Sequence, residues 1–200
     1  MAPKRQTRAI STTTTSSQRV QNVKRNDSTV IKTSRLELRP PRPDDAPALF
    51  RNYATDASVT KYLPWAPHKS VEDTRIFIAS RIAQWETGDA YAWTISLDTH
   101  PEPIGMIELR GDGTIGYVLG RRWWNRGIMS EALRAVVDHA RGTLGLSALR
   151  AWCDAENIGS ARVLEKAGFA LERTAPAPMA HSGYGDQIRP ALFYVRTNSY

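Results

Sequence analysis

The sequence predicts a mixed α/β domain, because short strand patterns are grouped together and interleaved with amphipathic helices along one chain of 200 residues. Apolar residues make up 41% and charged residues 24% of the chain, which is typical of a globular protein. No apolar run approaches the roughly 18 residues that a membrane-spanning helix needs. We therefore expect a single folded domain around one sheet, with no membrane partner.

The beginning of the chain differs in composition from the rest. Residues 1–35 contain eight Lys or Arg and one acid, Asp27, whereas residues 36–200 contain 19 basic and 19 acidic side chains. A Ser/Thr/Arg-rich segment cannot bury enough apolar surface to fold, so residues 1–33 are predicted to be a disordered tail and residues 34–200 the folded domain. Because the basic charge is confined to the tail, we expect no specific nucleic-acid partner. The single cysteine and the lack of an apolar secretory stretch in the first residues predict a cytoplasmic location. An organellar transit peptide and a nucleic-acid-binding arm stay open as alternatives for the tail.

The first elements of the domain follow one another closely. Leu36–Leu38 alternates like a short strand, and 44–55 has a helical pattern. Ser70 with Asp73 forms a capping-box signature, which predicts that a helix begins there. That helix places four apolar residues on one face: Val71, Ile78, Ile82 and Trp85.

The remaining elements alternate between strands and helices. Three strands are predicted, separated by Pro- and Gly-containing turns: 91–97, 104–109 and 114–119. A helix over 128–141 has a buried stripe of Ala132, Leu133, Val136, Val137 and Ala140. A strand at 149–154, a helix at 160–166 and a strand at 191–196 complete the domain.

Several kinds of chemistry are excluded by spacing. The segment 111–116 matches the dinucleotide-binding glycine pattern, but a strand rather than a helix follows it, so it is predicted to be a hairpin turn. The four histidines are scattered without ligand spacing, and one cysteine cannot build a zinc site, so we expect no metal. The cysteine, Cys153, lies in an apolar run and is predicted to be a buried, inert thiol.

Residues 116–133 form the informative segment: a strand, a basic loop with Gly127, and an amphipathic helix. Such a loop presents backbone N–H groups at a helix N-terminus, which favours phosphate. Arg121, Arg122 and Arg126 add full positive charges. Taken alone, the loop is explained as simply by a solvated turn.

This segment resembles the acetyl-CoA-binding motif of the GNAT N-acetyltransferases, whose loop reads Gln/Arg-x-x-Gly-x-Gly/Ala. Gly127 matches the central glycine, whereas Trp124 and Met129 replace the first and last residues, as in RimJ/RimL-like members. The resemblance implies acetyl-CoA as co-substrate and a twisted, mostly antiparallel sheet whose fourth and fifth strands are splayed to admit it. The implied cofactor contacts are Tyr117, Val118, Leu119, Trp124, Asn125, Arg126, Gly127, Ile128, Met129 and Ser130.

A second block, 154–169, resembles the family segment in which the fifth strand passes into the next helix. Asn157 matches the asparagine that contacts the pantetheine arm, and Ser160 matches the serine near the CoA sulfur. Helix capping is the structural alternative for both residues.

Two further stretches, 62–68 and 181–196, are similar to the RimJ/RimL-like branch, although Ile188 and Pro190 interrupt its Pro-Arg-Asp pattern. The resemblance spans residues 34–197.

The resemblance implies direct transfer of an acetyl group to a primary amine, with Ser160 as the proton donor to the sulfur. Many relatives carry a basic carboxylate where this chain has Thr114. Glu108 and His181 are the candidates for the base, beside a chain of water molecules. The acceptor, a small molecule or a protein N-terminus, stays open, as does the choice between monomer and homodimer. A non-catalytic acyl-CoA-binding or interaction module is the alternative function.

Overall fold

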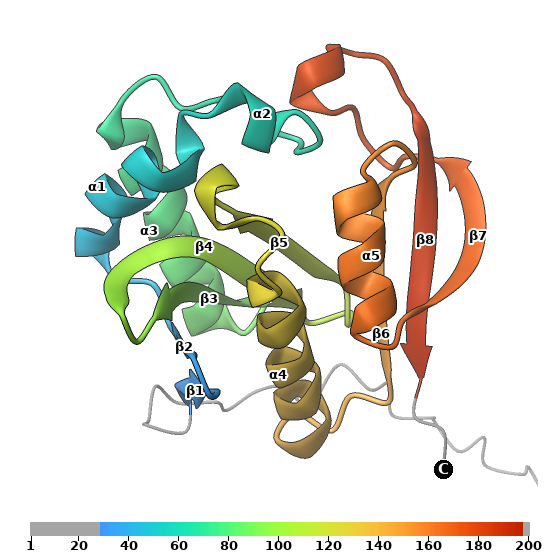
Figure 1. The fold of residues 1–200 in the computed structure, drawn as a ribbon, viewed down its shortest axis with the longest axis horizontal. Coiled ribbons are helices and arrows are strands. Elements are labelled where there is room, and N and C mark those ends of the chain that lie inside the picture. Colours follow the sequence, from blue (N-terminus) through green and yellow to red (C-terminus); the bar gives the residue numbers. More distant parts are fainter. Residues whose placement is uncertain (1–28, 198–200) are drawn as a thin grey trace, which may run out of the picture.

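The computed structural model describes residues 29–197, which form two antiparallel sheets (Figure 1). The first sheet has the order β1-β2-β3-β4-β5 and the second the order β6-β8-β7. A parallel bridge joins Thr114 to Arg150, and the Arg150 N–H donates to the Gly113 carbonyl at 2.9 Å. The predicted α/β fold with a mostly antiparallel, splayed sheet is confirmed.

The strands of the first sheet are β1 Ile31–Lys32, β2 Leu36–Arg39, β3 Ala90–Leu97, β4 His100–Arg110 and β5 Ile115–Leu119. Those of the second sheet are β6 Ala148–Asp154, β7 Ala170–Pro176 and β8 Pro190–Thr197. The helices are α1 Ala46–Leu49, α2 Ala57–Thr60, α3 Val71–Thr87, α4 Ile128–Gly142 and α5 Ile158–Lys166. Irregular helical turns at Pro43–Asp45 and Phe50–Ala54 flank α1, so the helix predicted over 44–55 is broken into three pieces.

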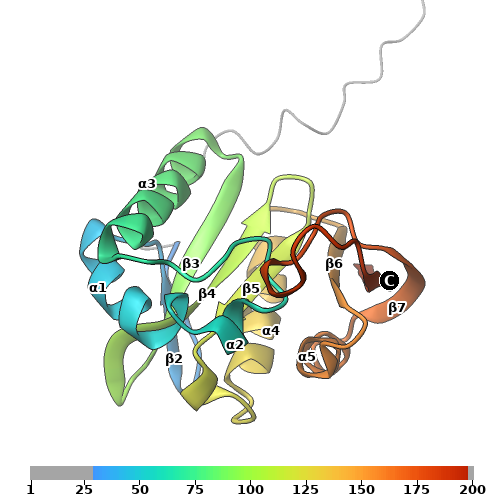
Figure 2. The same ribbon diagram turned by 90° about the horizontal axis from the view of Figure 1, so that it is seen from above.

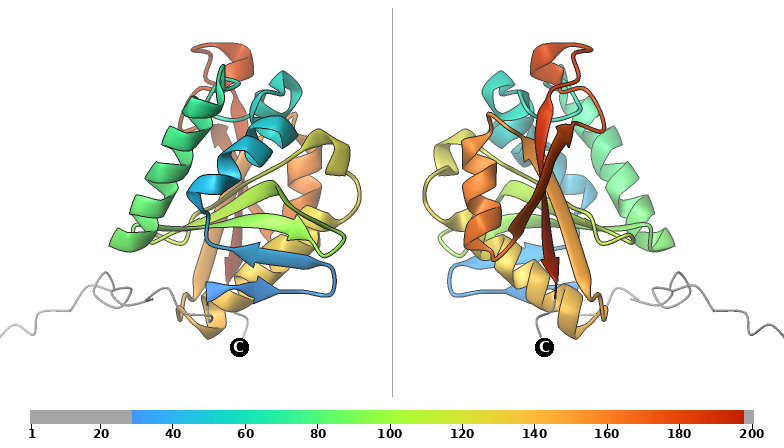
Figure 3. Two further views of the ribbon diagram at one scale, coloured as in Figure 1. Left: turned by 90° about the vertical axis from the view of Figure 1, so that its left-hand side faces the viewer. Right: turned by 90° about the vertical axis from the view of Figure 1, so that its right-hand side faces the viewer.

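Helices cover the sheets from two sides (Figures 2 and 3). α4 and α5 contribute to the larger apolar cluster, in which Leu133 and Leu164 are fully buried. α1 and α3 lie over the other side of the first sheet, where Leu49 and Ile78 pack with Met106 in a second cluster. The splayed part of the sheet therefore has one side toward α4 and α5 and one side toward α1 and α3.

The strongest sequence signals for helices are confirmed. All five residues of the predicted stripe on α4 are fully buried. At the start of α3, the Ser70 hydroxyl accepts from the Asp73 N–H at 3.3 Å, and the Asp73 carboxylate accepts from the Ser70 N–H at 3.0 Å. This reciprocal pair is the capping box that the sequence predicts.

The folded part starts earlier than expected. Residues 29–33 were expected in the tail, but Ile31 and Lys32 pair with β2, and the Thr29 carbonyl accepts from the Trp93 indole N–H at 2.8 Å. The boundary after residue 33 is therefore corrected to residue 29 or before it; residues 1–28 lie outside the described residues. Within 29–197, no helix is long and apolar enough to cross a membrane.

Candidate active site

β5 and β6 are joined at the Thr114–Arg150 bridge and do not pair beyond it. We call this unpaired region between the two strands the splay. The outer edge of β5 faces it. The Gly120 N–H donates to the Ile104 carbonyl of β4 at 2.9 Å. Bonded residues alternate with outward-pointing ones along an antiparallel strand, so the main-chain groups of Tyr117 and Leu119 point into the splay.

Val118 is placed differently from its neighbours. By the same alternation its main-chain groups turn to β4, and its side chain packs in the cluster of α1 and α3. Of the three predicted strand contacts to the cofactor, Tyr117 and Leu119 therefore lie at the free edge, whereas Val118 does not.

The loop before α4 has the backbone shape of an anion site. Asn125 and Gly127 both adopt left-handed φ values, 59° and 74°, and Gly127 is the N-cap of α4. The first bond back to the N-cap is from the Glu131 N–H to the Gly127 carbonyl at 3.0 Å. The N–H groups of Ile128, Met129 and Ser130 thus have no acceptor inside the helix, while their side chains are buried. Such free N–H groups at a helix N-terminus favour phosphate.

Basic and aromatic side chains surround this loop. Arg122 and Arg126 lie over the Trp123 ring, with guanidinium-to-centroid distances of 5.2 and 5.4 Å, and both are exposed. The Trp124 indole N–H donates to the Leu119 carbonyl at 2.7 Å, which joins the loop to the free edge of β5. The loop therefore retains exposed cations while its backbone is held in place.

Glu131 supports the loop and the start of α4 through partners in the turn between β1 and β2, and these partners were not predicted. The Glu131 carboxylate accepts from Arg35 Nη2 at 2.6 Å and from the Thr33 hydroxyl at 2.5 Å. Arg35 also donates to the Arg126 carbonyl at 3.4 Å. Burial raises the pKa of Glu131, but the hydrogen bonds from Thr33 and Arg35 outweigh it and hold the pKa below its usual range. The partners lie almost 100 residues apart, so no local pattern indicates this contact.

Asn157 and Ser160 begin α5 on the far side of the splay. Asn157 Oδ1 accepts from the Ser160 N–H at 3.1 Å, so the capping role considered for Asn157 is present. Ser160 Oγ lies 2.8 Å from the Tyr117 phenol oxygen, across the splay from β5. Burial raises the pKa of the neighbouring Cys153 thiol to about 11, which fits the predicted inert thiol.

Glu108, the first candidate base, is engaged with two charged groups. Glu108 pairs with Arg81 of α3 and accepts from Arg110 Nε at 3.0 Å. The Glu108 carboxylate is therefore not free above the splay.

His181 is 1% exposed and stacks on Trp152 at a centroid distance of 5.4 Å. Its Nδ1 lies 3.3 Å from the Asp154 carboxylate, and neither ring nitrogen has a hydrogen-bond partner within the described chain. Among residues 29–197 no three His, Cys, Asp or Glu side chains are grouped to hold a metal.

Two segments far apart in sequence meet beside the splay (Figure 2). The Ser182 N–H donates to the Leu63 carbonyl at 2.8 Å, and the Ser182 hydroxyl to the Thr60 carbonyl at 2.7 Å. The rings of Tyr62 and Tyr184 lie 6.0 Å apart. The stretches 62–68 and 181–196, singled out separately in the sequence, are thus brought together.

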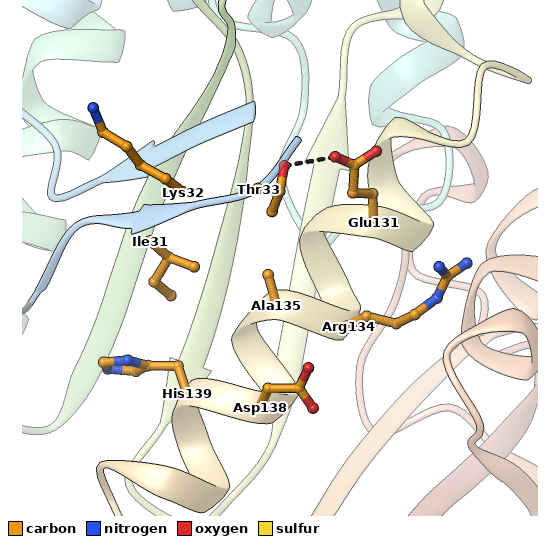
Figure 4. Close-up of a pocket in the computed structure, with 8 residues that line it drawn as sticks. All are labelled: Ile31, Lys32, Thr33, Glu131, Arg134, Ala135, Asp138 and His139. Carbon is orange, nitrogen blue, oxygen red and sulfur yellow. Dashed lines mark hydrogen bonds between the residues drawn. The ribbon is translucent and has the colours of Figure 1, made fainter. Parts of the chain in front are cut away.

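An open groove lies elsewhere, between β1 and α4 (Figure 4). Its lining includes Lys32, Arg134, Asp138 and His139, and it contains none of the predicted site residues. The groove therefore does not belong to the predicted cofactor site.

Comparison with known proteins identifies the family of this chain. The acetyltransferase (GNAT) domain family matches residues 35–170. The chain is 33% identical over 148 residues to p20 of Bacillus licheniformis, described as an uncharacterized N-acetyltransferase; the match covers 71% of this chain and 83% of p20.

Solved structures share the fold. Mycobacterium smegmatis RimJ in complex with a CoA disulfide has a TM-score of 0.72 at 24% identity, over 81% of both chains. An acetyl transferase of Salmonella typhimurium that modifies the N-terminal serine of ribosomal protein L7/L12 has a TM-score of 0.73 at 23% identity, over 85% of this chain and 99% of its own. Because the family match spans most of the domain and the sheets have the expected splay, this chain belongs to the GNAT family of acetyltransferases.

Proposed function

We propose that this protein transfers an acetyl group directly from acetyl-CoA to the primary amine of a small molecule or a protein N-terminus. The observation that carries the proposal is the free edge of β5 at Tyr117 and Leu119, which continues through the Trp124 contact into the N–H groups at the start of α4. The first feature suits an extended amide-containing chain, and the second suits a pyrophosphate. The CoA bound to the RimJ relative supports the same choice.

In this proposal some residues of the site bind acetyl-CoA and others take part in the transfer. Acetyl-CoA supplies an activated acetyl group as a thioester. The loop around Gly127 holds the phosphates, and the outward N–H of Leu119 stabilises negative charge that develops on the thioester oxygen. The Ser160 hydroxyl lies across the splay and hydrogen-bonds the departing sulfur. Holding the amine and the thioester together supplies much of the acceleration.

The amine proton is lost to water in this proposal. Two guanidinium groups neutralise Glu108, and His181 is enclosed beside Asp154 and Trp152. A general base has to be free to accept a proton within hydrogen-bond reach of the amine. Water is therefore a better first acceptor than either side chain in this conformation.

A thiol-release assay with a panel of small amines and free peptide N-termini tests the proposal. We expect amine-dependent release of CoA, with the acetylated product identified by its mass. Peptides with a blocked N-terminus are the control for the site of transfer. Binding of acetyl-CoA without transfer to any amine would instead favour the non-catalytic alternative.

A further inference from the structure

Tyr117 crosses the splay and contacts the residue that we propose to act on the sulfur. Its phenol oxygen lies 2.8 Å from Ser160 Oγ and 3.1 Å from the Ser160 carbonyl oxygen. Within the described chain, these are the side-chain hydrogen bonds that connect β5 to α5. Because Ile115 and Leu119 point into the core below α4, the ring of Tyr117 lies on that same side of the sheet.

The surroundings keep this phenol protonated. Burial strongly raises the pKa of Tyr117, and the hydrogen bond with Ser160 lowers it only in part. Cys153 and Tyr194 are the nearby titratable groups, and burial raises the pKa of each, to about 11 and about 12. Glu165 accepts from the Tyr194 hydroxyl at 3.2 Å, and Asp154 and Glu165 are the acids that act on the Cys153 thiol. The contact is therefore between neutral hydroxyl groups with one proton each.

Two arrangements of these protons fit the observed distances. In the first, the Tyr117 hydroxyl donates to the Ser160 carbonyl and the Ser160 hydroxyl donates to the phenol oxygen. The Ser160 hydroxyl then cannot donate to another group. When the Tyr117 hydroxyl donates to Ser160 Oγ, the Ser160 proton is free to point to a third group. A hydroxyl that accepts one hydrogen bond is also a stronger donor of the next, because chained hydrogen bonds polarise one another.

We propose that Tyr117 is a positioning residue whose hydroxyl switches from the Ser160 carbonyl to Ser160 Oγ and thereby directs the Ser160 proton to the CoA sulfur. The inference rests on the proposed function of this site. As the carbon–sulfur bond breaks, its electron pair stays on sulfur, which accepts the Ser160 hydrogen bond. No proton leaves Tyr117; the proton lost by the amine goes to water, and the thiolate takes one from water after release.

The first test needs no acceptor amine. The full chain is saturated with CoA, and the bound thiol is titrated by the ultraviolet absorbance of its thiolate, in wild type and in Tyr117→Phe, which keeps the ring and removes the hydroxyl. In the proposal the Ser160 hydroxyl donates a charge-assisted hydrogen bond that stabilises the thiolate. Tyr117→Phe no longer directs this proton to the sulfur, so we expect the variant to raise the pKa of the bound thiol by about one unit. Tyr194→Phe is the matched control, since it removes a neighbouring phenol that bonds Glu165 instead of Ser160.

The second test uses turnover with any amine that the enzyme accepts. We expect Tyr117→Phe to lower kcat about tenfold while KM for acetyl-CoA stays within about twofold. Because Tyr117 acts through Ser160, the double variant with Ser160→Ala should be no slower than Ser160→Ala alone.

The outcomes separate this inference from the proposed function. If the wild type does not bind CoA, both the proposed function and the role of Tyr117 are overturned. Normal CoA binding with the same thiol pKa in wild type and Tyr117→Phe would overturn the role of Tyr117 alone. Losses in kcat that multiply in the double variant would also overturn it.

Discussion

The two sides of the splay differ in how they use charge. On the side of α4 and α5, the groups that meet across it are neutral, namely Tyr117, Ser160 and Cys153. On the opposite side, Glu108 pairs with Arg81, and Asp154 pairs with Arg189 beside His181. The first side depends on main-chain and hydroxyl groups, whereas the second depends on paired charges held by α3 and by the loop before β8.

This difference matters for what each side can recognise. Main-chain N–H groups bind a ligand in a way that depends little on side-chain identity. Ion pairs depend on the identity of both side chains and can be changed by single substitutions. In the proposed function the neutral side binds acetyl-CoA through its main chain, which leaves the charged side as the place where side-chain identity can affect the acceptor.

The largest expected effect is on the charged side. Asp154 is buried, and its carboxylate accepts from Arg189 Nε at 2.7 Å. Removing one partner leaves a buried charge unpaired, so Arg189→Met should lower Tm by about 6 °C or more. Arg75→Met, which breaks the exposed pair with Glu72, is the control and should change Tm by less than about 2 °C.

The same pair gives a pH dependence of known sign. Burial raises the pKa of Asp154, but the hydrogen bonds from Arg189 and from the Glu156 N–H outweigh it and lower the pKa. The stabilisation is therefore present above the ordinary Asp pKa of about 3.9 and is lost as the pH falls through the lower folded value. Melting curves should show the gap between wild type and Arg189→Met narrowing below about pH 4; a constant gap would contradict this.

On the neutral side, Ser160→Ala should reduce kcat about 10²-fold and leave acetyl-CoA affinity within about twofold, because the bond to sulfur strengthens only as the thioester breaks. Asn157 caps α5, so the variant loses no cap and should melt within about 2 °C of wild type. Single-turnover rates and melting curves on one preparation measure both quantities. A destabilised but fully active variant would make Ser160 a structural residue.

The sequence predicts the neutral side far better than the charged side. The strand at 115–119, the loop at Gly127 and the helix with its buried stripe are local patterns, and the hairpin turn at Gly113 is confirmed by its φ of 83°. The Arg81–Glu108 and Arg189–Asp154 pairs join elements 27 and 35 residues apart. No periodicity specifies such partners, because they depend on how the elements pack.

Burial explains what was missed among the strands. β7 is almost entirely exposed along its length, so it lacks the alternation of apolar residues that predicts a strand. β1 has two residues and is held by pairing with β2 and by contacts at Thr29 and Thr33. Both elements are specified by their partners more than by their own sequence.

Gly127→Pro should weaken acetyl-CoA binding at least about tenfold, equivalent to about 1.4 kcal/mol. Proline fixes φ near −65°, whereas Gly127 adopts 74°, so the free N–H groups of the loop would be misdirected. Gly145→Pro is the matched control, because Gly145 also has a positive φ, 66°, but follows α4 at its other end. Calorimetry measures the affinity. If a folded Gly127→Pro variant binds acetyl-CoA as tightly as wild type, the loop is not part of the binding site.

The smallest expected effect concerns the start of the chain. It tests whether residues 29–197 contain every residue that the acetyl-CoA site needs. Deleting residues 1–28 should change turnover by no more than about twofold, because it removes mainly basic charge and leaves residues 29–200 with 21 basic and 19 acidic side chains, close to balance. Deleting residues 1–33 instead removes β1 and the Thr33 hydroxyl that donates to Glu131 at 2.5 Å. Glu131 then keeps Arg35 at 2.6 Å and the Ser34 hydroxyl at 3.4 Å but loses its shortest hydrogen bond, so acetyl-CoA affinity should fall about fivefold. Equal affinities of the two truncated proteins would show that the support of the loop does not reach β1, and a large loss with the shorter deletion would place part of the site before residue 29.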